Sequence, residues 1–328
     1  ASGSVYDSGD FSALLEEALA AADWDGFAAR QAESRARGRL RGRGIGNFLE
    51  CTAPPVKEQG EIIFEPDGTV TIVTGTLDYG QGHWTPFAQV LHQSLGVPFD
   101  AIRIVQGDSD RLVAGGGTGG SKSIMASGAA IVEAAALVIG IMDLAAKLRA
   151  ERDRLPGDIP HTLDVRHVFD QAPMAFPNGC HVCEVEIDPD TGITEVVRYT
   201  AVNDFGVIVN PLLVEGQAHG GIVQGIGQAL MEHVAYSEDG QLLSGSYQDY
   251  ALPRASDVPG FGFVSRPVPC RTNPLGAKGC GEAGCAGSLP AVMNAVVDAL
   301  GEFGIDHIDM PATPERVWRA IQAARGAG

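Results

Sequence analysis

The 328-residue sequence predicts an α+β fold in which mixed sheets pack against helices. Segments with strand-like alternation are interleaved with segments of helical periodicity, and several neighbouring strands are joined as hairpins. Because hairpins produce antiparallel pairs, this pattern argues against a doubly wound parallel sheet. The two halves share an outline of hairpin, glycine-rich loop and helix. With 45% hydrophobic residues, the chain can form one large or two modest domains.

The first half is predicted to open with a helix and to continue through a hairpin. Asp10 suits the N-cap of the first helix, whose apolar residues recur on one stripe. A Pro66-Asp67-Gly68 turn joins the hairpin strands, and Gly96 ends the next helix. The expected elements are a helix after Asp10, strands over 61–64 and 69–74, a helix over 84–95, a strand over 102–105, a loop over 107–121 and a long helix over 123–154.

The second half is predicted to repeat this outline. Residues 156–177 contain four prolines and are expected to connect the two halves. The elements expected beyond them are hairpin strands over 183–187 and 193–202, a helix over 213–232, a strand ending in a turn over 237–240, a Gly/Cys loop over 273–287, a helix over 289–303 opened by Pro290, and a terminal helix over 311–324.

Composition excludes some classes of partner. Lys and Arg total 23 against 41 Asp and Glu, so the net charge of −18 makes a nucleic-acid partner unexpected. The most hydrophobic stretch, residues 134–142, is much shorter than the ~20 residues of a membrane span, so no membrane-spanning segment is expected. Six cysteines and no visible signal peptide suggest a cytoplasmic protein. Cys180 and Cys183 have metal-ligand spacing, but ordinary strand packing is the favoured interpretation.

Residues 30–43 are rich in arginine and contain no lysine. Two interpretations remain open: a solvated helix face, or a surface that docks on an acidic partner subunit.

Four loops place glycine and small polar residues just before a helix. Helix N-termini expose unpaired N–H groups and a partial positive charge, so several such loops suit a large, multiply anionic ligand. Tight turns and close helix packing are the structural alternative for any one of them. A P-loop does not fit, because the spacing of its glycines is absent. The loops are Gly80–His83, Thr118–Ser123, Gly216–Gln217 and Lys278–Glu282.

Glu282 is the candidate base. It lies in a glycine loop beside apolar neighbours, where a carboxyl group can have a raised pKa and accept a proton. The alternative is an acidic residue that balances the dipole at a helix start.

Five motifs together resemble the molybdenum-binding large subunit of the xanthine dehydrogenase and aldehyde oxidase family, most of all its carbon-monoxide-dehydrogenase type. They occur in order along essentially the whole chain, which resembles only the second half of such a subunit. The motifs are Gly80-Gln-Gly-His83, Gly120-Ser-Lys-Ser123, Val214-Glu-Gly-Gln217, Asp249-Tyr-Ala-Leu-Pro-Arg254 and Lys278-Gly-Cys-Gly-Glu282.

The resemblance implies two cofactor-binding subdomains, 1–160 and 161–328, and roles for single residues. Glu282 matches the base that takes a proton from the hydroxide on molybdenum, after which hydride passes to a sulfido ligand. No residue is expected to ligate the metal. The residues expected to bind the pterin cofactor are Gln81, Gly82, His83, Thr85, Thr118, Gly120, Ser121, Lys122, Ser123, Asn210, Gln217, Lys278, Gly279, Cys280 and Gly281.

The implied activity is oxidative hydroxylation of a small substrate with water as oxygen source. The implied cofactor is molybdopterin in its cytosine dinucleotide form, with [2Fe–2S] clusters and FAD on partner subunits and a further chain carrying the first half of the molybdenum subunit. A naturally split subunit and a truncated polypeptide both remain open, and so does the substrate, which could be a purine, another N-heterocycle, an aldehyde or carbon monoxide. Two other functions also stay open: a structural or cofactor-storage chain of the same fold, and a plain nucleotide-binding module.

Overall fold

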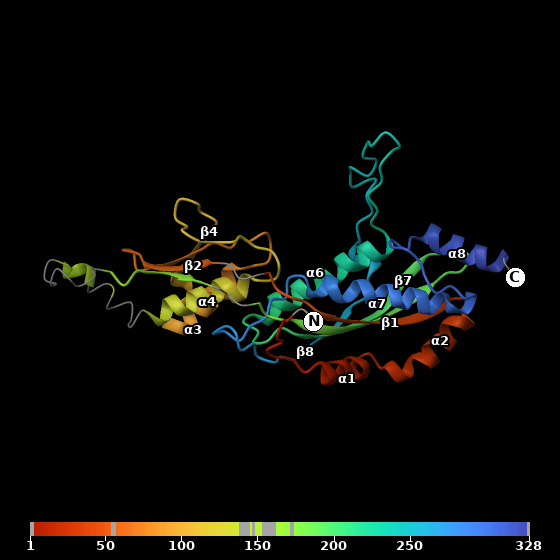
Figure 1. Cartoon of the computed structure of the whole chain (residues 1–328), viewed down its shortest axis with the longest axis horizontal. Coiled ribbons are helices and arrows are strands. Elements are labelled where there is room, and N and C mark those ends of the chain that lie inside the picture. Colours follow the sequence, from red (N-terminus) through yellow and green to blue (C-terminus); the bar gives the residue numbers. More distant parts are fainter. Residues whose placement is uncertain are drawn as a thin grey trace.

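Two four-stranded sheets organise the described part of the computed structural model, which comprises residues 3–53, 57–137, 145, 148–152, 162–170 and 174–326 (Figure 1). The first sheet has the order β4-β3-β2-β5 and the second the order β1-β6-β7-β8. The strands are β1 (Leu40–Leu49), β2 (Glu58–Phe64), β3 (Val70–Thr74), β4 (Ile102–Gln106), β5 (Val165–Phe169), β6 (Asn178–Ile187), β7 (Thr194–Asp204) and β8 (Phe261–Ser265).

Both sheets follow one plan. Each centres on a hairpin, β2–β3 or β6–β7, with a parallel strand on one side and an antiparallel strand on the other. The mixed sheets confirm the predicted α+β class, and the likeness of the two halves extends to pairing direction. Each sheet also contains one strand from the other half of the chain. β1, which precedes residue 160, pairs with β6 of the second half, and β5, which follows residue 160, pairs with β2 of the first half.

Helices follow the strands in the same order in both halves. The hairpin β2–β3 leads to α3, β4 and α4, and the hairpin β6–β7 leads to α6, β8 and α7. Sequence signals bound several of them: the Asp10 and Asn210 carboxyl and amide oxygens cap α1 and α6, and Gly96 ends α3 at φ 69°. The helices are α1 (Phe11–Ala21), α2 (Phe27–Ala36), α3 (Trp84–Leu95), α4 (Ser123–Ala136), α6 (Pro211–Leu230), α7 (Ala283–Leu300) and α8 (Pro314–Gly326).

A stripe of glycines lets α7 lie directly on β1. A Cβ atom at Gly42, Gly44 or Gly46 would come within 2.1–2.2 Å of a backbone oxygen of α7. Only hydrogen fits at these positions, so the strand and helix backbones approach closely. The apolar side chains of α7 then join β6, α6 and α8 in the main core.

Several predicted elements have different bounds. The helix expected over 123–154 is described as α4 only to Ala136, and much of its remainder lies outside the described residues. The proline-rich connector contains a strand, β5, since its alternating residues pair with β2. α7 begins at Ala283 and holds Pro290 inside its first turns, not at its start. The strand expected before the 237–240 turn is reduced to a single bridge, Tyr236 to Leu242, within an arm that projects from the end of α6 (Figure 1).

The arginine-rich segment has a further role within the chain itself. Arg35 and Arg37, in its middle, are 60% and 58% exposed at the end of α2, which agrees with a solvated helix face, whereas the arginines near its two ends bind buried carboxylates. Arg30 and Arg41 bind the Glu184 carboxylate at 2.6 and 2.7 Å, and Arg41 also reaches Glu186 at 3.0 Å. Both glutamates lie on β6 with side chains only 3% and 8% exposed. Buried carboxylates require countercharge, and this segment of the same chain provides it.

Apolar surroundings account for two further sequence features. Cys180 and Cys183 are buried and unpaired on β6, and burial raises the pKa of both thiols, which confirms strand packing. Although the sequence predicts no membrane span, residues Ala283–Phe303, in and just after α7, form a helical stretch that is long and apolar enough to cross a membrane. Its position in the core explains its apolar composition without a membrane.

Candidate active site

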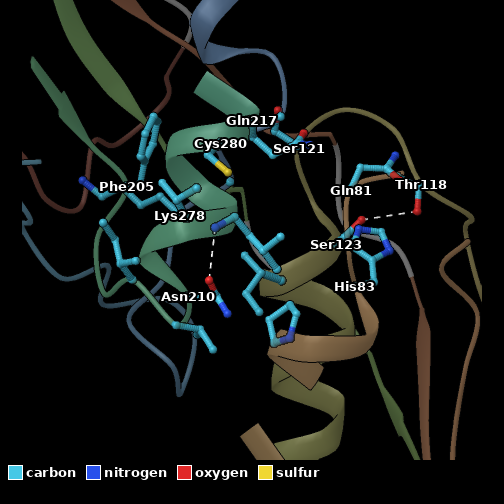
Figure 2. A pocket seen from close by; sticks show the side chains of 18 of the residues that line it. Gln81, His83, Thr118, Ser121, Ser123, Phe205, Asn210, Gln217, Lys278 and Cys280 are labelled. Atoms are coloured by element: carbon cyan, nitrogen blue, oxygen red, sulfur yellow. Dashed lines mark hydrogen bonds between the residues drawn. The ribbon is translucent and has the colours of Figure 1, made fainter. Parts of the chain in front are cut away.

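A cavity of about 290 Å³ lies where the two halves of the chain meet. Figure 2 shows Gln81, His83 and Thr118 on one side of it, and Asn210, Lys278 and Cys280 on the other. The predicted site residues that line it are Gln81, His83, Thr118, Gly120, Ser121, Ser123, Asn210, Gln217, Lys278, Gly279, Cys280, Gly281 and Glu282. Gly82, Thr85 and Lys122 do not line the cavity wall.

The repeated plan explains why these loops meet. In each half, one lining loop precedes the helix after the hairpin, and another precedes the helix after the parallel strand. The N-terminal ends of α3, α4, α6 and α7 therefore all contribute to the cavity wall. Such ends attract anionic groups. Apolar side chains, including Phe205, Val207 and Leu213, complete the lining.

Asp78 orders the loop before α3. Its carboxylate accepts hydrogen bonds from the backbone N–H groups of Gly80, Gly82 and His83 at 2.7–3.1 Å. Burial raises the pKa of Asp78, but these three bonds outweigh burial and lower it overall. The Gln81 side-chain oxygen accepts from the Tyr79 N–H, which leaves the Gln81 amide nitrogen available to a ligand.

His83 is a neutral ring with an unused nitrogen. Only 8% of the residue is exposed, and burial lowers its pKa, so the imidazole is uncharged at neutral pH. The ring stacks on Phe87 with centroids 5.3 Å apart. Its Nδ1 atom is buried and has no partner among the described residues, as expected if a bound group completes the site.

The loop before α4 is held by unusual backbone geometry. Ser121 has φ 54°, rare for a residue with a side chain, and its carbonyl lies against Gly279, where a Cβ atom would approach to 1.6 Å. Lys122 turns back and donates to the Gly116 carbonyl at 2.9 Å. Lys122 therefore orders this loop and stays away from the cavity.

Lys278 and Asp204 form a buried ion pair behind the loop that precedes α7. Their Nζ and Oδ2 atoms are 2.6 Å apart, with side chains 0% and 1% exposed. The backbone N–H groups of Gly206 and Val268 also donate to Asp204, each at 2.9 Å. The pair fixes the position of Lys278 and of the glycine loop that follows it.

Glu282 stands at the N-cap position of α7 and lines the cavity. Its carboxylate accepts a hydrogen bond from the Ser121 hydroxyl at 3.0 Å, and the Glu282 backbone N–H donates to the Ser121 hydroxyl oxygen at 3.1 Å. Ser121 thus connects the α4 loop to the α7 loop and aims this carboxylate.

Glu50 is a neighbour of this site that the sequence did not indicate. It follows β1 directly, and the Glu282 charge contributes to raising its pKa. A glutamate just after a strand carries no local signal of function, because only long-range packing brings it to residue 282.

The model of the molybdopterin cofactor-binding domain matches residues 17–259, well over half of the chain. The chain belongs to the molybdopterin cofactor-binding domain family. Its relatives include the carbon monoxide dehydrogenase large chain of Hydrogenophaga pseudoflava, 32% identical over 98% of this chain and 46% of the relative. The nicotine 6-hydroxylase large subunit of Paenarthrobacter nicotinovorans is 32% identical over 98% of this chain and 45% of that subunit.

Among solved structures, CO dehydrogenase from Oligotropha carboxidovorans superposes with a TM-score of 0.90 at 29% identity, covering 98% of this chain and 46% of that one. The α+β fold of the molybdenum-cofactor-binding family is therefore shown. The chain spans about half the length of the relatives that it matches.

The residues of the cavity fit a molybdenum–pterin cofactor. Gln81 and Gln217 offer amides, Thr118 and Ser123 offer hydroxyls, and His83 offers a ring nitrogen that no described residue contacts by a hydrogen bond. Such donors suit a ligand with many acceptor atoms, and the glycine loops allow the backbone to approach it closely.

Proposed function

We propose that the chain is the C-terminal part of the catalytic subunit of a molybdenum hydroxylase, which hydroxylates a small substrate with oxygen from water. The observation that carries this proposal is that Glu282 shares one cavity with the glutamine, hydroxyl and glycine loops that suit the family's cofactor. Two of the relatives, a carbon monoxide dehydrogenase and a nicotine hydroxylase, support the reaction class.

Each residue has a defined task in this proposal. When bound, the molybdenum cofactor would supply the two-electron redox chemistry. Gln81, Gln217 and the loop of Thr118 to Ser123 would hold its pterin and nucleotide, which we propose to be the cytosine dinucleotide form. Glu282 accepts the proton released as water gives its oxygen to the substrate, and the Ser121 hydroxyl orients its carboxylate.

Electrons must then leave the site. We propose that they pass to [2Fe–2S] clusters and FAD on partner subunits, and that a polypeptide equivalent to the other half of the relatives closes the pocket. The six cysteines form no disulfide, which accords with a reducing, cytoplasmic location.

Metal and nucleotide analysis of the natural polypeptide or complex containing this chain tests the proposal. We expect stoichiometric molybdenum, cytidine monophosphate released on acid hydrolysis, and substrate-dependent turnover. Molybdenum without turnover on any of the candidate substrate classes would favour a cofactor-storage chain. Absence of molybdenum together with tight binding of CTP or ATP alone would replace the proposal with a nucleotide-binding module.

A further inference from the structure

The packing of β1 on α7 places two carboxyl groups at the same end of both elements. Gly42 faces Ala295 and Ala299 of α7, whereas Gly46, further along β1, faces Gly287. The strand and the helix therefore run in opposite directions. The end of β1 meets the start of α7, so Glu50 comes beside Glu282.

Glu50 is poorly suited to remain charged. Both of its carboxyl oxygens are buried, and neither has a hydrogen bond of normal geometry from the described residues. Burial raises the pKa of Glu50 to about 7, the nearby Ser121 hydroxyl opposes this rise, and the Glu282 carboxylate adds to it. No lysine or arginine in the described part of the chain counteracts the rise.

Among the described residues, the Glu50 charge also acts on the Cys280 thiol. Burial, with a smaller contribution from the Glu50 charge, raises the pKa of Cys280 to about 12. Cys280 therefore remains neutral at physiological pH and neither supplies nor removes charge.

A single hydroxyl proton cannot serve both carboxylates. Ser121 donates to Glu282 at 3.0 Å, and while it does so it has no second hydrogen for Glu50. Two adjacent carboxylates that no cation among the described residues neutralises favour a state in which one of them keeps a proton. Glu50, whose oxygens are buried, is the better site for that proton, since Glu282 is exposed to the cavity.

We propose that Glu50 and Glu282 form a proton-sharing carboxyl pair, in which Glu50 holds the proton and so keeps Glu282 ionised as an acceptor. Its catalytic meaning rests on the function proposed above. The resting pair carries one proton, and it carries two after Glu282 has accepted one from the reacting water. The added proton is released to solvent before the next turnover. Glu50 is thus a positioning residue that acts through Glu282.

Infrared difference spectroscopy of the natural protein against its Glu50→Gln variant tests the pair without cofactor or turnover. We expect the protonated carboxyl absorption of Glu50 to titrate with a midpoint near 7. In a Glu282→Gln background the midpoint should fall by about one pH unit or more, because the neighbouring charge is gone. An unchanged midpoint would show that burial alone raises the pKa of Glu50 and would overturn the proposed pair. A Glu50 that is fully ionised at pH 6 would also overturn it.

Thermal unfolding gives a second readout. A carboxyl group whose pKa is higher in the folded than in the unfolded state loses its contribution to stability as the pH rises through the folded-state pKa. Native protein should therefore lose stability from pH 5 to 8 relative to Glu50→Gln. We expect the Tm difference to grow by roughly 2–4 °C over this range. The control, Glu315→Gln on the exposed face of α8, should show no such growth. A Tm difference for Glu50→Gln that does not change with pH would contradict the proposal. Both readouts are independent of whether the protein proves to be a molybdenum hydroxylase.

Discussion

At the residue scale, Lys278 and Asp204 show how a buried charge can support a site without taking part in its chemistry. Water is excluded from both side chains, and the loop that carries Cys280 and Glu282 begins at this lysine. Removing one member of such a pair leaves an uncompensated charge in an apolar environment.

Lys278→Met should therefore lower the free energy of unfolding by about 3–5 kcal/mol, because Asp204 would lose its countercharge while remaining buried. Urea unfolding followed by circular dichroism measures this loss. The matched control is Arg319→Met, which breaks an exposed i,i+4 pair with Glu315 on α8 and should cost no more than about 0.5 kcal/mol. Equal losses in the two variants would show that the buried pair has no special role.

At the scale of elements, the contact between β1 and α7 determines the geometry of the site. The glycines of β1 permit it, and the arginines around β1 attach that strand to the acidic residues of β6. The start of α7, with Glu282, is positioned by this arrangement.

Gly44→Ala should destabilise the fold by about 1–3 kcal/mol, because its Cβ would lie 2.2 Å from the Ala291 carbonyl oxygen of α7. Differential scanning calorimetry gives the shift in Tm. Gly220→Ala on α6 is the control: nothing lies within 4 Å of its added Cβ, so alanine's helix propensity should make it neutral or stabilising by up to about 1 kcal/mol. A neutral Gly44→Ala would refute the close-contact explanation.

Glu186→Gln should weaken the link between β1 and β6 in a pH-dependent way. Burial raises the pKa of Glu186, but hydrogen bonds from Ser34 and Arg37 and the charge of Arg41 outweigh it and lower the pKa below 4.5. Its stabilising effect is thus present above pH 4.5 and is lost as the pH falls through the lowered value. The variant should lose Tm relative to native protein at pH 7 and lose less at pH 3. A deficit equally large at both pH values would contradict this assignment.

At the scale of the whole molecule, local sequence patterns predicted the helices and strands themselves better than the elements with which they pair or pack. The helix over 84–95 has the predicted bounds because an apolar stripe and Gly96 define it within one segment. The hairpin strands were found from their turns, although β6 and β7 extend beyond the predicted ranges. The pairing of β1 with β6, the strand β5 and the approach of Glu50 to Glu282 depend on contacts between distant segments, which no local pattern encodes.

The candidate site follows the same rule. Motifs predicted most of the residues that line the cavity, because each glycine loop is itself a local feature. They placed Lys122 at the cofactor, whereas that side chain turns to the Gly116 carbonyl. The direction of a side chain depends on its loop's fold, which the sequence pattern does not reveal.

The most direct measurement on the whole molecule is turnover of the molybdenum-loaded protein carrying Glu282→Gln. We expect the turnover rate to fall by about 10²- to 10⁴-fold, as on loss of a general base, while molybdenum content and Tm stay close to those of native protein. Glu315→Gln should leave the rate unchanged. A Glu282→Gln protein that retained its molybdenum and the full native rate would contradict the assignment of Glu282 as the base of this cavity.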